Sequence, residues 1–278
     1  MQWQCRHRTI DLARPVVMGI LNVTPDSFSD GGRYSGVEAA LARAAQMVAE
    51  GAAIIDVGGE STRPGSLGVD AATERERVVP VIERIAASLD VAISIDTSKV
   101  EVMAAAVGAG ACIVNDVAAL CAPGARAWAA QARVGVCLMH MQGEPRTMQA
   151  DPRYHDVVSE VNAFLLNERA HCIAAGIAAE SIALDPGLGF GKRYEHSLAL
   201  LKHLDHITAS GAPLLVGVSR KSLIGEVLGR GVEERLYGGL GLAAWAASRG
   251  AHVLRTHDVA PTRDAIRMVS AVLEGRVN

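Results

Sequence analysis

Short apolar runs alternate with longer helical patterns along this whole chain, and that alternation limits the possible folds more than any other feature. The runs are rich in Val, Ile, Leu and Ala, as are strands that are buried on both faces of a parallel sheet. Each run ends in polar residues or glycine. We predict eight strands: Val16–Asn22, Ala53–Gly58, Ala92–Asp96, Cys112–Asn115, Val134–His140, Ile182–Asp185, Leu214–Ser219 and His252–His257.

The segments between these runs carry apolar residues at helical spacing. The clearest predicted helices are Val37–Glu50, Ala72–Leu89, Lys99–Gly108, Asp156–Ala175 and Gly238–Arg249. Several segments end in a glycine just before the next strand, as helices with a left-handed C-terminal cap do. These glycines are Gly51, Gly110, Gly176 and Gly250.

Eight strands that alternate with helices favour an α/β fold of the (β/α)8 (TIM) barrel type. The competing topology is a doubly wound open sheet, but no GxGxxG motif opens a helix after the first strand. No linker or low-complexity run interrupts the 278 residues, so we predict one domain over 1–278. The short N-terminal segment before the first strand is predicted to close the barrel floor.

Composition narrows the possible partners. The net charge is −3 and aromatic residues make up 4%, so we expect neither nucleic acid nor an anionic membrane as a partner. The five cysteines are odd in number and form no CxxC, which argues against a disulfide framework or a zinc site. The sequence has no signal-peptide core and no membrane-length apolar stretch. We therefore expect a soluble, cytoplasmic protein that binds small molecules.

Polar side chains end nearly every predicted strand, and in a barrel these ends meet at one mouth. Asp96, Asn115 and Asp185 supply hydrogen-bond acceptors and Lys221 supplies a donor. This set suits a flat heterocycle with amino and ring N–H groups along one edge. A structural ion-pair network is the alternative. We favour a binding site, because burying these charges together is costly unless they meet a ligand.

A second set is cationic and suits a diphosphate: Arg63, Arg255 and His257, together with Asn22. Arg255 and His257 are two residues apart on a strand and so share a face, whereas Thr256 points away and offers a phosphate only its backbone. Arg63 could be an ordinary surface cation. Its flanking glycines and proline instead indicate a loop that can close over a ligand.

Asn22 ends the first predicted strand, and Asp26 and Asp30 follow it in a polar loop. A neutral carbonyl oxygen beside two carboxylates suits a hard cation or a phosphate. A polar strand cap over a turn explains the same residues equally well. On this stretch alone, both interpretations remain open.

The turn DPGLGFGK (185–192) resembles a phosphate-binding loop only superficially. Its spacing is not GxxxxGK[ST], and Arg193 follows the lysine. We instead predict that the glycines let the chain turn sharply after Asp185. Phe190 would then form an apolar wall beside the site.

Eight segments stand out in order along the chain: NVTPDSFSDGG (22–32), IIDVGGESTRPGS (54–66), SIDTSK (94–99), VNDV (114–117), LMHMQGEPRTMQ (138–149), LDPGLGFGK (184–192), LLVGVSRKSLIG (214–225) and LRTHDV (254–259). Together they resemble, in the same order, segments of dihydropteroate synthases of the folate pathway. The resemblance spans nearly the whole chain.

The resemblance implies an enzyme that joins 6-hydroxymethyl-7,8-dihydropterin diphosphate to 4-aminobenzoate and releases diphosphate and 7,8-dihydropteroate. It also implies a Mg²⁺ cofactor held by Asn22, a homodimer and inhibition by sulfonamides. By matching positions, Asp96, Asn115, Asp185 and Lys221 would bind the pterin, and Arg63, Arg255 and His257, with the backbone at Thr256, the diphosphate. Thr62, Pro64, Phe190, Ser219 and Lys221 would border the aminobenzoate.

The expected mechanism ionises the CH₂–diphosphate bond before the amine attacks. The predicted catalytic residues are Asp96, Lys221 and Arg63, and the loops Thr24–Tyr34 and Glu60–Leu67 would close to exclude water. Two alternatives remain: a pterin-binding methyltransferase barrel, which needs no diphosphate-binding cations, and a non-catalytic pterin-binding homologue. The homodimer contact is expected on Gly238–Arg249 and Thr262–Glu274.

Overall fold

Eight parallel strands form the centre of the computed structural model, which describes residues 1–23, 32–60, 68–144 and 146–275. Their order is β8-β7-β6-β5-β4-β3-β10-β9. A bridge between Leu184 and Leu214 joins the two outer strands, and the Leu184 N–H donates to the carbonyl of Pro213 at 2.8 Å. The sheet thus closes into the predicted (β/α)8 barrel. Its strands are β3 (Val16–Asn22), β4 (Ala52–Gly58), β5 (Ala92–Asp96), β6 (Ile113–Asp116), β7 (Gly135–Met139), β8 (Ile182–Asp185), β9 (Leu215–Gly217) and β10 (Val253–Thr256).

The predicted strands agree with these bounds to within a few residues. β3, β5 and β8 match at both ends. The largest difference lies at β9, where the prediction Leu214–Ser219 is too long. Arg220 has φ 58°, so the chain leaves the regular strand conformation there and turns across the mouth of the barrel.

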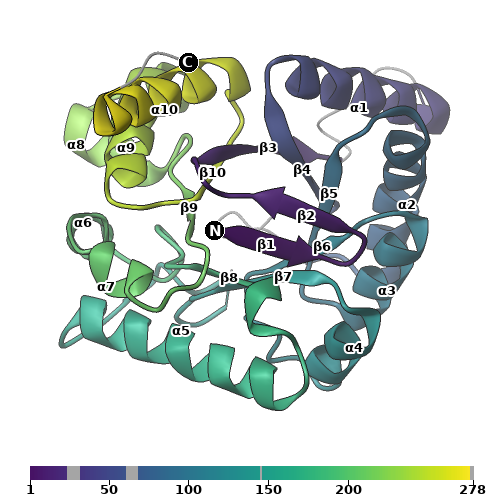
Figure 1. Cartoon of the computed structure of the whole chain (residues 1–278), viewed down its shortest axis with the longest axis horizontal. Helices are drawn as coiled ribbons and strands as arrows, with labels where there is room; N and C mark the ends of the chain where they lie inside the picture. The colour runs from purple at the N-terminus through teal and green to yellow at the C-terminus, as the bar shows by residue number, and fades with distance from the viewer. Residues whose placement is uncertain (24–31, 61–67, 145, 276–278) are drawn as a thin grey trace.

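Helices surround the strands (Figure 1). The glycines after Glu50, Ala109, Ala175 and Arg249 have φ between 89° and 126°, as predicted for left-handed caps. Aspartates begin two of the helices, since Asp70 accepts from the Thr73 N–H at 2.7 Å and Asp156 from the Val158 N–H at 3.1 Å. The helices are α1 (Gly32–Ala49), α2 (Ala71–Ser88), α3 (Val100–Ala109), α4 (Ala125–Ala132), α5 (Val157–Ala174), α6 (Tyr194–Lys202), α7 (Asp205–Thr208), α8 (Ser222–Leu228), α9 (Leu236–Ser248) and α10 (Val259–Glu274), with 3₁₀ turns η2 (Ala179–Ser181) and η3 (Val232–Glu234).

An antiparallel hairpin closes one end of the barrel. It consists of β1 (Gln2–Cys5) and β2 (Arg8–Asp11) and crosses in front of the strands in Figure 1. Trp3 is fully buried in it, and its indole N–H donates to the carbonyl of Ser181 at 2.9 Å. Trp3 packs in one apolar cluster with Met18 and Ile54 of the barrel interior. The predicted closure of the floor is confirmed.

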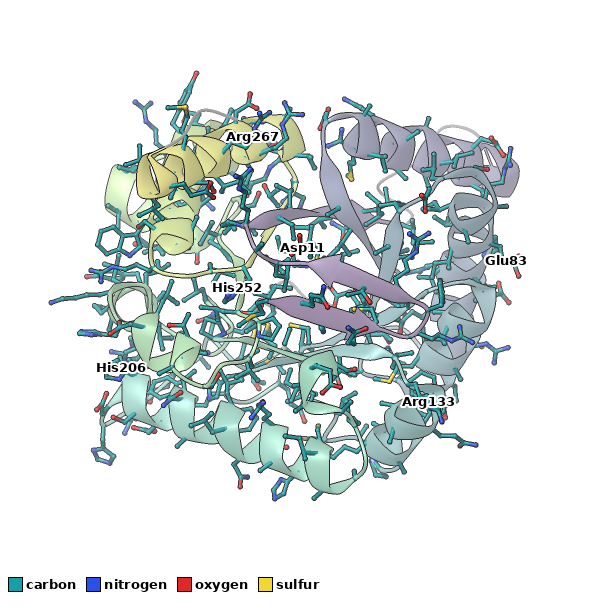
Figure 2. All side chains as sticks on the ribbon, viewed as in Figure 1. Asp11, Glu83, Arg133, His206, His252 and Arg267 are labelled. Carbon is teal, nitrogen blue, oxygen red and sulfur yellow. The ribbon has the colours of Figure 1, made fainter. Side chains whose placement is uncertain are left out.

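The apolar side chains divide into two cores. The larger core lies between strands and helices and includes Ile55 and Val57 of β4, whereas Ile54 of the same strand belongs to the floor cluster. Side chains fill the space around and inside the ring of strands (Figure 2). Because the floor is apolar, the polar inward-facing residues gather at the opposite end, where the strands finish.

Candidate active site

The strand register brings the predicted residues to one mouth. Asn22 is level with Gly58, Gly58 with Asp96, and Asp96 with Asn115 on successive strands. Gly58 carries no side chain, and a Cβ placed there would lie 3.5 Å from Asn22 Oδ1 and 3.7 Å from Asp96 Cβ. The glycine therefore leaves the Asn22 and Asp96 side chains on either side of one small gap.

Arg255 of β10 reaches across the mouth to two carboxylates. Its Nε donates to Asp56 Oδ2 at 2.6 Å, and its Nη2 donates to Asp96 Oδ2 at 2.7 Å. Asn115 Nδ2 donates to the same Asp56 Oδ2 at 3.1 Å. Three strands on one side of the barrel are thus tied to β10 by a single guanidinium, directly through Asp56 and Asp96 and, through Asp56, to Asn115.

Asp56 is a site residue that the sequence analysis missed. It lies two residues before the end of β4, and its side chain is fully buried. Its Oδ1 has no hydrogen-bond partner among the described residues. The available signal was a carboxylate inside the apolar run IIDVGG, because a buried charge needs a partner or a ligand.

Asp185, Lys221 and Phe190 meet on the other side of the mouth. The Gly187 N–H donates to Asp185 Oδ1 at 2.7 Å. Lys221 Nζ lies 4.2 Å from the centroid of the Phe190 ring, a cation–π arrangement. Burial lowers the pKa of Lys221 to about 8, and Asp185, Arg255 and Asp96 all act on it electrostatically. The predicted acceptors and cations therefore share one site.

Burial also raises the pKa values of two carboxylates at the mouth. Desolvation raises the pKa of Asp96 to about 7; Arg255 opposes this rise, and Asp56 adds to it. Burial raises the pKa of Asp185 as well, against the hydrogen bond from Gly187. Burial by itself would lower the pKa of Arg255, but Asp56 and Asp96 raise it above its usual value. Perturbed groups that converge at a barrel mouth are typical of catalytic sites.

Ser219 and His257 form a pair beside this cluster. Ser219 Oγ lies 3.0 Å from His257 Nδ1 and accepts the His257 backbone N–H at 3.2 Å. Both residues follow adjacent strands, β9 and β10. The pairing fixes the His257 ring at the edge of the mouth near Arg255, where the sequence places it.

Thr256 points away from the mouth, as the alternation along a strand requires. Its Oγ1 lies 3.1 Å from Thr262 Oγ1 on α10 and accepts the Asp258 N–H at 3.1 Å. The side chain is buried against the helix layer. Only the backbone of Thr256 is placed for the substrate-binding role that the sequence suggested.

Thr62, Arg63 and Pro64 lie outside the described residues, as do residues 24–31 and the rest of the segment 61–67. The described base of the second loop is held by Lys99. Its Nζ donates to Glu74 Oε2 at 2.6 Å and also binds the Glu60 carboxylate. This lysine is a second feature that strand-end reasoning did not find.

Asn22 is suited to a magnesium ion that is shared with a phosphate ligand. Its side-chain oxygen takes part in no hydrogen bond between described residues and faces the gap over Gly58. Mg²⁺ is commonly bound by one or two protein oxygens together with water and substrate phosphates. A single oxygen beside an arginine-lined mouth fits that pattern.

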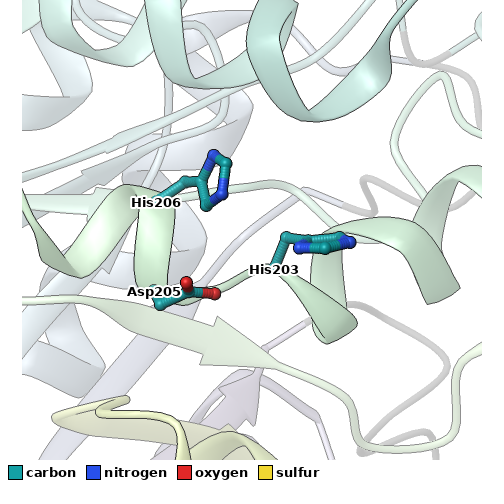
Figure 3. A group of neighbouring side chains, drawn as sticks. All are labelled: His203, Asp205 and His206. Carbon is teal, nitrogen blue, oxygen red and sulfur yellow. The ribbon is translucent and has the colours of Figure 1, made fainter.

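A different group of metal-ligand types lies on the outside of the barrel. His203, Asp205 and His206 have ligand atoms within 4.8 Å of one another (Figure 3). They lie at the junction of α6 and α7, from which the chain enters the amino end of β9. This is the end opposite the mouth, so the group has no part in the site.

Among the described helices, none is long and apolar enough to cross a membrane.

A closed parallel barrel with buried, electrostatically coupled charges at its carboxyl end defines an enzyme that binds a small polar molecule there. The model of the pterin binding enzyme family matches residues 18–257 of this chain. The chain belongs to that family.

Its relatives narrow the class further. Dihydropteroate synthase of Escherichia coli K12 is 51% identical over 270 residues, which cover 97% of this chain and 96% of the relative. The Yersinia pestis enzyme, solved as a sulfonamide drug complex, is 47% identical with a TM-score of 0.93 and covers 99% of this chain and 100% of its own. The Xanthomonas albilineans enzyme with 4-aminobenzoic acid is 48% identical with a TM-score of 0.92, at 98% of each chain. These matches confirm the family resemblance seen in the sequence.

Proposed function

We propose that this chain condenses 6-hydroxymethyl-7,8-dihydropterin diphosphate with 4-aminobenzoate and releases 7,8-dihydropteroate and diphosphate. The observation that carries this proposal is the single mouth where Arg255 bridges Asp56 and Asp96, beside Asp185 and Lys221. The Xanthomonas albilineans relative has also been solved in complex with 7,8-dihydropteroate, at 46% identity and a TM-score of 0.90. One reactant of this reaction, 4-aminobenzoic acid, and its product thus each occur in a structure of this relative.

The buried acceptors suit the pterin ring. Asp96, Asn115 and Asp185 lie on neighbouring parts of the barrel mouth and are mostly withdrawn from solvent. A pterin presents an amino group and ring N–H groups that can donate to them. A ring without these donors would leave buried acceptors unpaired, which gives strong discrimination.

The diphosphate would lie on the cationic side. A guanidinium has five N–H donors, and Arg255 uses two of its nitrogens to hold the carboxylates. Its remaining donors can bind phosphate oxygens without releasing Asp56 and Asp96. His257 lies beside it, and the resemblance adds Arg63 from the segment 61–67. Asn22 would hold Mg²⁺, which when bound neutralises charge on the leaving diphosphate.

The chemical step follows from the electronics of the dihydropterin. The CH₂–O bond breaks, its electron pair leaves with the diphosphate, and the positive charge that remains spreads into the electron-rich ring. The Asp96 carboxylate would stabilise this cation. The amine of 4-aminobenzoate then attacks the methylene carbon and loses a proton. Lys221, between the Phe190 ring and Asp185, would help to hold the two reactants in line.

The two alternative functions explain the cationic residues Arg63, Arg255 and His257 less well than the synthase does. A methyltransferase barrel would share the pterin acceptors but has no diphosphate to bind. A non-catalytic homologue would be expected to lose Asn22, Arg63 or the Ser219 and Lys221 pair, and all four residues are present. Identity of about half the residues over the full length also favours the synthase activity.

The proposal extends to a cytoplasmic homodimer that sulfonamides inhibit. Its dimer contact would use α9 and α10, where large apolar side chains are exposed: Tyr237 (83%), Met268 (65%), Val272 (76%) and Leu273 (66%). Such a cluster is unusual on a surface that meets only water. All five cysteines are free and four are buried, which suits a reducing compartment.

The direct test mixes the purified protein with the dihydropterin diphosphate, 4-aminobenzoate and Mg²⁺. We expect diphosphate and dihydropteroate to appear in equal amounts, and EDTA to suppress both. Diphosphate release without dihydropteroate would indicate simple hydrolysis. Tight pterin binding without either product would favour the non-catalytic homologue.

A further inference from the structure

Lys192 is buried next to the site but lies outside the set of residues that would touch the substrates. Only 3% of the Lys192 surface is exposed. Its Nζ lies 2.8 Å from His140 Nδ1 and donates to three carbonyl oxygens: those of His140 at 3.2 Å, Gly187 at 3.0 Å and Phe190 at 3.0 Å. Burial lowers the pKa of Lys192 to about 7. A buried amine needs acceptors for its N–H groups, and three carbonyl oxygens and the His140 imidazole surround this one.

The three glycines around Phe190 explain why carbonyl oxygens converge on this lysine. Gly187, Gly189 and Gly191 have φ of 64°, 79° and 58°, so the chain forms no regular hydrogen-bond ladder. A side chain at Gly187 would overlap the carbonyl oxygen of His140, and one at Gly191 would overlap that of Gln142. The turn 186–191 therefore packs directly on the backbone that follows β7.

Within the turn, the Phe190 N–H donates to the carbonyl of Gly187 at 3.0 Å, and side chains supply further donors. Lys192 binds the carbonyls of Gly187 and Phe190, Tyr154 Oη donates to the carbonyl of Gly191 at 2.7 Å, and Gln149 binds that of Gly189. Of the side chains of Lys192, Tyr154 and Gln149, that of Lys192 is buried and donates to two carbonyls of the turn, whereas each of the others donates to one. Lys192 is thus the central fixing point of the turn.

The turn determines where Phe190 lies, and Phe190 borders the proposed aminobenzoate site. The Phe190 ring lies 4.2 Å below Lys221 Nζ, and a Cβ on Gly189 would lie 3.6 Å from Lys221 Cδ. A small movement of the turn would displace both the ring and the Lys221 side chain. By contrast, Asp96 on β5 and Asn115 on β6 are hydrogen-bonded to Arg255 and Asp56. The turn reaches the proposed pterin side through the Gly187 N–H, which donates to Asp185.

We infer that Lys192 is a positioning residue, an internal hydrogen-bond donor that fixes the turn 186–191 and so sets the position of Phe190 against the amine substrate. The inference rests on the proposed condensation, because the amine is the substrate of that reaction. Lys192 itself does not contact the reactants. Its role is to hold the wall of the aminobenzoate site in the orientation that the attack requires.

The test compares Lys192→Met, which keeps the length and removes the N–H donors, with Lys202→Met, a control at an exposed position on α6. We expect Lys192→Met to raise the KM for 4-aminobenzoate about tenfold, and to weaken pterin binding by a smaller factor, because the turn reaches Asp185 through the Gly187 N–H. Lys202→Met should match the parent. A purely structural role would lower the folded fraction and kcat per total protein but leave the KM at the parent value, and that result would overturn the inference.

A second variant keeps the inference testable if Lys192→Met does not fold. Tyr154→Phe removes one donor to the same turn and should raise the KM for 4-aminobenzoate in the same direction, by a smaller factor. An unchanged KM in Tyr154→Phe would then count against the inference. If the parent protein forms no dihydropteroate, the proposed function fails instead, and the aminobenzoate affinities of the folded variants still decide the role of Lys192.

Discussion

Arg255 Nη2 donates to Asp96 Oδ2 at 2.7 Å, which joins the last strand of the barrel to the strand that carries the proposed cation-stabilising carboxylate. The same guanidinium holds Asp56. One arginine therefore holds two carboxylates of the mouth and keeps further N–H donors available. Under the proposed function, stability and substrate binding both depend on this residue.

Replacing Arg255 should lower both the stability of the fold and the binding of the pterin diphosphate. Arg255→Met leaves the buried Asp56 carboxylate without its strongest partner, and we expect a loss of about 3 kcal/mol in the free energy of unfolding. kcat/KM for the pterin diphosphate should fall by about 100-fold or more. Urea denaturation and steady-state kinetics measure the two effects.

The double variant Asp56→Asn with Arg255→Met separates these effects. It removes the unpaired charge, so most of the lost stability should return while activity stays low. If activity returns together with stability, Arg255 has no direct part in substrate binding.

The turn at Gly187 should tolerate no side chain. Gly187→Ala forces a methyl group onto the carbonyl of His140 and disturbs the N–H that holds Asp185, so pterin affinity should fall at least tenfold. Gly211→Ala is the matched control. Its φ of 72° is similar, but nothing lies within 4 Å of the added carbon, so only a strain cost of about 1 kcal/mol is expected. Equal pterin affinities in the two variants would show that the close packing at Gly187 does not matter.

Pterin binding should depend on pH through Asp96. Burial raises the pKa of Asp96 to about 7, and the ionised carboxylate is the form that accepts hydrogen bonds from the ring. The affinity for a pterin alcohol, which carries no titrating phosphate, should therefore decrease as the pH falls below about 7. Fluorescence titrations between pH 5.5 and about 8.5 test this. Asp96→Asn should bind weakly with no such dependence, and an equally steep slope in that variant would assign the titration to another group.

Acid stability should depend on His140. Burial and Lys192 lower the pKa of His140 to about 3, whereas an unfolded histidine titrates near 6.5. The unfolded state binds more protons between these values, so the stability contributed by neutral His140 is present above about pH 6.5 and decreases as the pH falls toward 3. His140→Gln should lose stability less steeply, by up to about 1.4 kcal/mol per pH unit. Parallel stability curves for parent and variant between pH 6.5 and 4 would contradict the assignment.

The fold and much of the site follow from local sequence patterns. Buried runs that end in polar residues placed Asn22, Asp96, Asn115 and Asp185 correctly at strand ends, because side-chain alternation and the barrel topology are both short-range rules. Other predictions also rested on local features. The cysteine spacing argued against a zinc site, and the missing GxGxxG motif argued against a doubly wound sheet.

The remaining features depend on contacts between distant segments. Asp56 is hydrogen-bonded to Arg255, 199 residues away, and to Asn115, and no local sequence pattern predicts either contact. Lys192 resembles the end of a phosphate loop in sequence, yet its partners are carbonyl oxygens exposed by three left-handed glycines. Arg63 and Thr62 rest on the family resemblance, since they lie outside the described residues.

In the proposed reaction, the charged groups of this one mouth ionise the pterin substrate before the amine attacks. The most direct measurement is the secondary kinetic isotope effect for substrate with deuterium on its methylene carbon, taken under conditions where chemistry limits kcat/KM. Ionisation before attack predicts a normal effect, with the protiated substrate clearly faster, because the carbon flattens as the diphosphate leaves. A ratio of one would mean that the amine attacks while the bond to diphosphate is still intact, and would contradict the ionisation-first path.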